Sequence, residues 1–214
     1  MNSPATTGLV ERTRPTESIL PTPAHFVELL IHGRQNCTPR RLIEPGPSSP
    51  QLNALMAVAA AAPDHGELTP WRFVLIPEAR RQLLGDVFRA ALLERDSEAT
   101  PQQQTETSEK ARNAPCLLLA IIDLAPRHKS VPSIERILSL GCAIQNMLLT
   151  ARAMGYGSGL SSGKALESTA LRRTFGLSEH ERAACFVSFG TVSKARPVRT
   201  TRPPPTQIMS VFGA

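Results

Sequence analysis

The sequence predicts a β-sheet covered by helices, a layered domain of the α/β or α+β class. Two stretches, CLLLAIID at 116–123 and AACFVSFGTV at 183–192, are almost wholly apolar, which is typical of strands buried on both faces. Segments with helical spacing of apolar residues lie before and between them. With 214 residues, 41% of them apolar, the chain is long enough for one domain with a sizeable core.

The first part of the chain is expected to be an arm followed by two helices and a strand. Residues 1–22 are rich in Pro, Ser and Thr, so we expect a mobile arm. A helix is predicted over 24–33 and ends at Gly33. Residues 36–49 contain three prolines and are expected to form a loop. A second helix is predicted over 50–62, since proline suits a first helical turn, and the strand WRFVLI follows at 71–76.

The remaining elements also follow from periodicity and turn residues. Residues 77–96 predict an amphipathic helix, and 97–115 a polar crossing whose second half is helical. A long apolar helix is expected over 132–155, capped by Gly155. The glycine-rich stretch 156–162 is expected to be extended, and 167–177 to hold a short helix with a Ser or Thr cap.

Composition and motifs exclude several classes of function. The net charge of +6 is diffuse, without the basic stripe or motif of a nucleic-acid-binding protein. No apolar run is long enough for a membrane span, and no secretory signal is recognised, which favours a cytoplasmic protein. The four cysteines are far apart, and Cys116, Cys142 and Cys185 are expected to be buried free thiols. We therefore expect no metal site, and no P-loop or G-x-S-x-G motif occurs.

Three segments contain candidate ligand-binding residues, although each also has a plainer interpretation. Arg34, Gln35 and Asn36 follow the first helix, and arginine can hold a phosphate with two hydrogen bonds. His65 lies in the turn APDHGELTPWRF, and GYGSGLSSG at 155–163 could approach a flat ring closely. Taken separately, a solvated turn, a surface histidine and a flexible loop explain these segments equally well or better.

The order of these segments along the chain is more specific than any one of them. APDHGELTPWRF, then ARNAP before an apolar strand, then GCAIQNMLLTARAMGYGSG, then FGTV and a basic tail resemble the nitroreductase family. The similarity is greatest to its compact branch of NAD(P)H nitroreductases and covers about residues 24–212. It implies an α+β three-layer sandwich with a mostly antiparallel central sheet and a C-terminal segment exchanged in a homodimer.

The resemblance also implies domain boundaries and a cofactor site. Residues 1–22 would be the arm, 23–199 the FMN-binding domain, and 200–214 an extension packed on the partner subunit. One FMN would bind at each end of the subunit interface. The family usually has Arg-Arg-Ser where this chain reads Gly-Arg-Gln at 33–35. Some members also have an arginine four residues before the histidine, where this chain has Ala61. The residues that match the family's FMN contacts are Arg34, Gln35, Asn36, His65, Gly159, Leu160, Ser161, Lys194 and Arg196, with Arg40 or Arg41 as substitutes.

The function implied by the resemblance is that of an FMN-dependent NAD(P)H oxidoreductase. NADH or NADPH would donate hydride through flavin N5 to a small acceptor such as a nitroaromatic or quinone. No catalytic side chain is expected, because the cofactor carries the chemistry. Two alternatives remain open: oxidation of a specialised metabolite, for which Tyr156 could be the acid, and a non-catalytic flavin-binding protein.

Overall fold

The computed structural model describes residues 22–125, 131–194 and 202–213. Its centre is one five-stranded sheet with the order β1-β5-β3-β2, and β4 also pairs with β5. All its ladders are antiparallel, which confirms the predicted α+β class. The strands are β1 (Leu42–Ile43), β2 (Trp71–Leu75), β3 (Cys116–Asp123), β4 (Gly157–Ser161) and β5 (Glu181–Val192).

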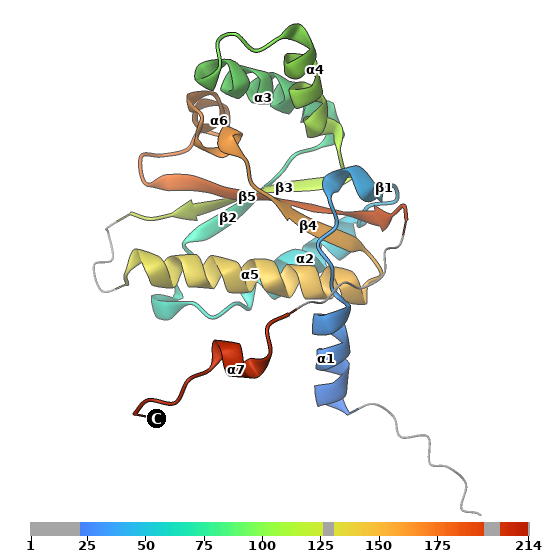
Figure 1. The fold of residues 1–214 in the computed structure, drawn as a ribbon, viewed down its shortest axis with the longest axis vertical. Helices are drawn as coiled ribbons and strands as arrows, with labels where there is room; N and C mark the ends of the chain where they lie inside the picture. The colour runs from blue at the N-terminus through green and yellow to red at the C-terminus, as the bar shows by residue number, and fades with distance from the viewer. Residues whose placement is uncertain (1–21, 126–130, 195–201, 214) are drawn as a thin grey trace, which may run out of the picture.

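Helices cover both faces of the sheet, giving the three layers that were predicted (Figure 1). One layer contains α2 (Ser49–Ala60) and α5 (Ser133–Ala153), and the other α3 (Arg81–Arg95), α4 (Pro101–Glu109) and α6 (Thr169–Thr174). Strand β3 is buried along nearly its whole length because both faces are covered. Its side chains alternate: Leu118 packs in the core under α2 and α5, and Leu119 in the core under α3.

The helices start where the sequence supplies caps. At α2, Ser48 and Gln51 form a capping box, and Thr100 and Gln103 do the same at α4. Each of these helices also has proline in its first turn, where the missing N–H costs nothing. Short 3-10 turns join several elements: Pro39–Arg41, His65–Glu67, Glu78–Arg80, Lys110–Arg112 and Lys164–Glu167.

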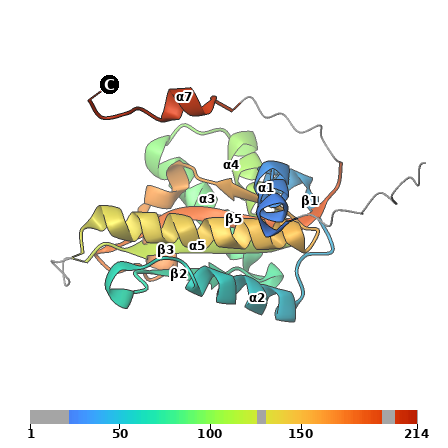
Figure 2. The ribbon, with the colours of Figure 1, turned by 90° about the horizontal axis from the view of Figure 1, so that it is seen from below.

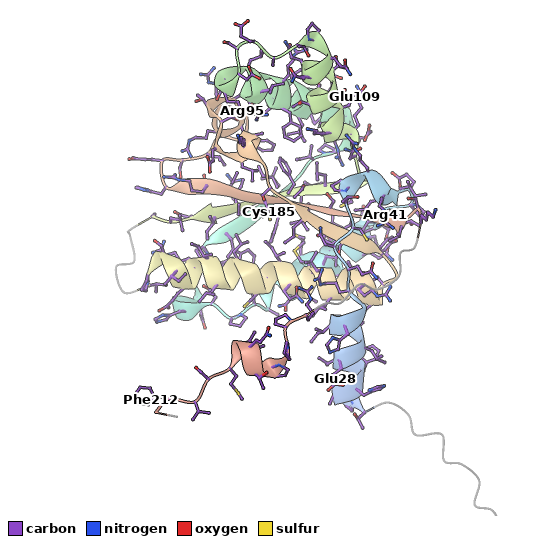
Figure 3. All side chains as sticks on the ribbon, in the orientation of Figure 1. Glu28, Arg41, Arg95, Glu109, Cys185 and Phe212 are labelled. Atoms are coloured by element: carbon purple, nitrogen blue, oxygen red, sulfur yellow. The ribbon has the colours of Figure 1, made fainter. Side chains whose placement is uncertain are left out.

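Helix α1 (Pro23–Gly33) and the C-terminal segment with α7 (Pro205–Ile208) project from this body (Figures 1 and 2). No residue of α1 is buried, and Phe26 and Leu29 are each about half exposed. In the C-terminal segment, the Phe212 side chain is fully exposed and lies away from the sheet (Figure 3). Helix α1 contacts α5, whose residues Ile134 and Leu138 are both 60% exposed.

Four expectations need correction. The helix in the polar crossing begins earlier, at Pro101, because Thr100 and Gln103 cap it. The proline-rich loop contains a two-residue strand, β1, paired with the end of β5. Cys142 is exposed, since it lies on the outer face of α5, and Cys185 is only partly buried. The glycine-rich stretch, by contrast, is extended as expected: it forms strand β4, which excludes the plainer interpretation as a flexible loop.

No helix among the described residues is long and apolar enough to cross a membrane. Within the same ranges, no group of three His, Cys, Asp or Glu side chains is placed to hold a metal ion.

Candidate functional site

The loop after α1 lies along strand β4, so two of the predicted segments meet. Asn36 forms a parallel bridge with Ser158, and the Cys37 N–H donates to the Ser158 carbonyl at 2.8 Å. The Leu160 N–H donates to the Asn36 side-chain oxygen at 2.9 Å. Arg34 and Gln35, both half-buried, directly precede this contact. Asn36 therefore holds the loop on β4, and Arg34 lies directly before this contact.

Gly159 makes this approach possible. Its position faces the backbone carbonyl of Cys37, and a Cβ built on Gly159 would overlap that oxygen. The neighbouring Gly157 is similarly enclosed by Val192 and Leu42. Gly159 therefore allows two backbones to approach closely, and Gly157 leaves room for the neighbouring side chains.

A cavity of about 530 Å³ lies beside this contact, between β4, α3, α4 and the 3-10 turn at Pro39–Arg41. Its walls are partly apolar, with Phe88, Leu117 and Phe186 contributing. The lining also includes four cationic side chains, Arg40, Arg95, Lys110 and Lys164, and the hydroxyl groups of Ser161 and Ser162. None of its lining residues is acidic. Such a cavity suits a flat apolar ring that carries negative charge.

Lys194 lies near the same end of the sheet. The Arg41 guanidinium donates to the Lys194 carbonyl, and the Ser193 N–H donates to the Arg41 carbonyl at 2.9 Å. These bonds hold the start of the basic tail against the turn that contributes Arg40 to the cavity. Arg196, also predicted to bind the cofactor, lies outside the described residues.

His65 is at the opposite end of the fold. Its ring contacts Glu135 in the first turn of α5, whereas Gly33, next to Arg34, faces Arg152 in the last turn. Since a helix rises about 1.5 Å per residue, these two ends of α5 are about 25 Å apart. Within one chain, therefore, the structure does not bring His65 to Arg34 and Gly159.

Two residues near the cavity had no signal in the sequence. They are Lys110, which lines it, and Arg81, which holds the turn next to Lys110. Arg81 is 1% exposed, and its guanidinium donates to the carbonyls of Ala111 and Ala114 at 3.0 and 3.2 Å. Longer bonds reach Asn113 and Pro115, and burial lowers the pKa of this guanidinium from its ordinary value. Arg81 thus fixes the turn from which Lys110 and Asn113 reach the cavity. An arginine in an amphipathic helix gave no signal of this.

Other reactive side chains are occupied elsewhere. Burial raises the pKa of the thiols of Cys116 and Cys185 to about 11 each, so neither is a ready nucleophile. The Tyr156 hydroxyl donates to Gln51 at 2.9 Å, which gives no support to its role as an acid for metabolite oxidation. Trp71 donates to Ser139 at 3.0 Å, and its ring lies tilted against that of Phe73, so Trp71 anchors the start of β2 to α5.

Residues 40–191 match the nitroreductase family. The chain belongs to this family. It is 33% identical over 152 residues to a Haemophilus influenzae protein named "Putative NAD(P)H nitroreductase", covering 71% of this chain and 82% of that protein. It is 31% identical over 189 residues to an Escherichia coli K12 protein of the same name, YdjA, covering 87% and 98%. The expectation of an NAD(P)H nitroreductase is thus confirmed at the level of the family.

Solved structures of nitroreductases have the same fold. A nitroreductase-like protein from Bacillus cereus superposes with a TM-score of 0.75 at 21% identity, covering 88% of this chain and 96% of that one. A variant of NfnB, an FMN- and NADPH-dependent nitroreductase from Sphigopyxis sp. strain HMH, gives a TM-score of 0.67 at 15% identity, covering 87% and 99%. At these identities the similarity supports the fold alone.

Proposed function

We propose that this protein is an FMN-dependent NAD(P)H oxidoreductase that reduces nitroaromatic or quinone-type acceptors. The observation that carries the proposal is the packing of the Arg34–Asn36 loop on β4, beside a cation-lined apolar cavity. Family membership and the FMN dependence of NfnB support it.

The side chains at this site fit the parts of FMN. The isoalloxazine ring needs apolar walls, which Phe88, Leu117 and Phe186 supply. Lys110 and Arg40 line the same cavity and would stabilise negative charge on the pyrimidine part of the ring. The phosphate would lie outside the cavity, where Arg34, Arg41 and Lys194 can supply cations. Arg196, outside the described residues, stays a proposed contact.

The chemistry that FMN would supply when bound is hydride transfer from NADH or NADPH to the acceptor. The chain's own residues then have three tasks: to hold the cofactor, to stabilise its negative charge and to shape the acceptor site. The cationic lining favours acceptors that are electron-poor or anionic, because they meet no carboxylate in the cavity.

We also propose that the protein is a homodimer in which His65 of one subunit reaches the flavin of the other. Exposed apolar residues are numerous on α1, on α5 and in the C-terminal segment, and soluble monomers rarely expose so many large apolar side chains together. A two-fold interface along α5 would bring the His65 end of one chain to the Arg34 end of its partner. Residues 23–199 would be the FMN-binding domain and 200–214 an extension packed on the partner, where Phe212 and Met209 would be buried.

Replacing Arg34 with alanine is expected to weaken FMN binding about tenfold or more, since a charge-assisted bond to the phosphate is lost. FMN titration of the apo-protein, followed by flavin fluorescence, measures this. Arg173→Ala, which removes an exposed arginine from α6, is the matched control. Unchanged affinity in Arg34→Ala would remove Arg34 from the site.

The proposed dimer predicts that the wild-type protein sediments with twice the mass of one chain. A protein that sediments as a monomer would contradict the shared site.

A further inference from the structure

The turn that contains His65 is locally strained and tightly held. Gly66, Glu67 and Thr69 all have positive φ, at 77°, 51° and 42°, although two of them carry a Cβ. The Thr69 N–H donates to the Asp64 carboxylate at 2.5 Å, which closes the turn on itself. Non-glycine residues adopt this region at a cost that the surrounding structure must offset. The turn therefore presents His65 in a defined position.

Glu135 fixes the orientation of the histidine ring. The His65 Nδ1 lies 2.5 Å from the Glu135 Oε2, although the two residues are 70 positions apart in the chain. A carboxylate accepts the hydrogen of Nδ1, so the free ring nitrogen is Nε2. The side chains are 60% and 40% exposed in the single chain, so Nε2 is open to a ligand and to water.

The other side chains at the proposed flavin site are poor proton donors near neutral pH. Arginine does not lose its proton in proteins, lysine ammonium groups ordinarily hold theirs up to about pH 10, and serine hydroxyls are very weak acids. Outside the cavity lining, the Tyr156 hydroxyl is engaged with Gln51, and burial keeps the thiols of Cys116 and Cys185 protonated. Histidine is the side chain that gains and loses a proton in this range.

We propose that His65, held by Glu135, donates the proton that an acceptor takes up at the flavin of the partner subunit. This inference rests on the proposed function, which supplies the hydride and the shared site. For a quinone, the hydride brings two electrons and one hydrogen, and the second hydrogen comes from the Nε2–H of the imidazolium. The Nε2–H bond breaks, an O–H bond forms on the quinone oxygen, and hydroquinone results as the flavin is oxidised. Water then reprotonates Nε2.

Glu135 acts as a positioning residue in this step. It keeps Nδ1–H in place in both protonation states of the ring. It also lies in the first turn of α5, where a carboxylate is favoured by the helix dipole. The acceptor would not touch Glu135 itself.

Two electron acceptors separate proton donation from cofactor binding. In stopped-flow reoxidation of the reduced protein, benzoquinone needs a proton, whereas ferricyanide takes single electrons and needs none. We expect His65→Gln to slow reoxidation by benzoquinone about tenfold or more, with ferricyanide within about twofold of wild type. Glu135→Gln should also slow reoxidation by benzoquinone more than reoxidation by ferricyanide, but by a smaller factor than His65→Gln. Glu67→Gln, which removes an exposed carboxylate from the same turn, is the matched control.

Nitrogen-15 NMR of the full-length protein without flavin provides a second readout. In neutral His65 the hydrogen should be on Nδ1, and Glu135→Gln should shift it toward Nε2. Equal slowing with both acceptors, unchanged benzoquinone rates, or hydrogen on Nε2 in the wild type would overturn the inference. If His65→Gln loses flavin, the test uses Glu135→Gln, which keeps the histidine ring. The ratio of its benzoquinone rate to its ferricyanide rate then decides. A wild-type protein that binds no FMN would contradict the proposed function instead, and the NMR result would still test the Glu135 contact.

Discussion

Replacing Gly159 with alanine is expected to destabilise the fold and to weaken FMN binding together. The added methyl group would overlap the Cys37 carbonyl oxygen, which belongs to the backbone and cannot rotate away. The loop must then separate from β4, which breaks the bonds from Leu160 to Asn36 and from Cys37 to Ser158. Overpacking of this kind costs about 1–3 kcal/mol. Arg34, held by the same loop, would lose its place.

Urea unfolding and FMN titration measure the two effects on one sample. Gly163→Ala is the stability control, because a Cβ at Gly163 has no neighbour within 4 Å. We expect its free energy of unfolding to stay within about 0.5 kcal/mol of wild type. A Gly159→Ala protein with wild-type stability would show that the loop does not pack on β4 as described.

Replacing Arg81 with methionine is expected to cost on the order of 3 kcal/mol of folding stability. Methionine fills a similar apolar volume but cannot donate, so the carbonyls of Ala111 and Ala114 would lose their buried partner. The turn at Lys110–Arg112 would then loosen, and Lys110 would be less well placed in the cavity. We therefore also expect weaker FMN binding in this variant.

Thermal or chemical unfolding compares this variant with Arg80→Met. Arg80 is the adjacent residue and is exposed, so its replacement should change stability by no more than about 0.5 kcal/mol. Arg81→Lys should fall between the two, since an ammonium group cannot span the same carbonyls. Equal stability of the two methionine variants would contradict the role assigned to Arg81.

Much of the fold could be predicted because local patterns determined it. The uninterrupted apolar run at 116–123 indicated a strand covered on both faces, and β3 is such a strand. The long periodic segment ending at Gly155, which has φ of 86°, became α5. Proline and capping residues located the helix starts to within a few positions.

The site could be predicted only in part, because its contacts join distant residues. Periodicity could not show that the Arg34 loop lies on β4, since an extended glycine-rich segment carries no signal of which backbone packs against it. Periodicity also did not predict the contact between His65 and Glu135. Nor did it predict that Arg81 is buried, because the residues on either side of it are polar and exposed. Cys142 was predicted to be buried because its sequence neighbours are apolar. It is exposed because the outer face of α5 carries apolar side chains that the described part of the chain leaves uncovered.

Anaerobic titration of the purified protein with NADH and NADPH tests the proposed function most directly. The protein should be yellow or become so with added FMN, and its visible flavin absorbance should bleach with about one equivalent of donor per site. Added benzoquinone should then restore the band, which shows that electrons pass through the bound flavin. A colourless protein that takes up no FMN, or a bound flavin that neither donor bleaches, would contradict the proposed function.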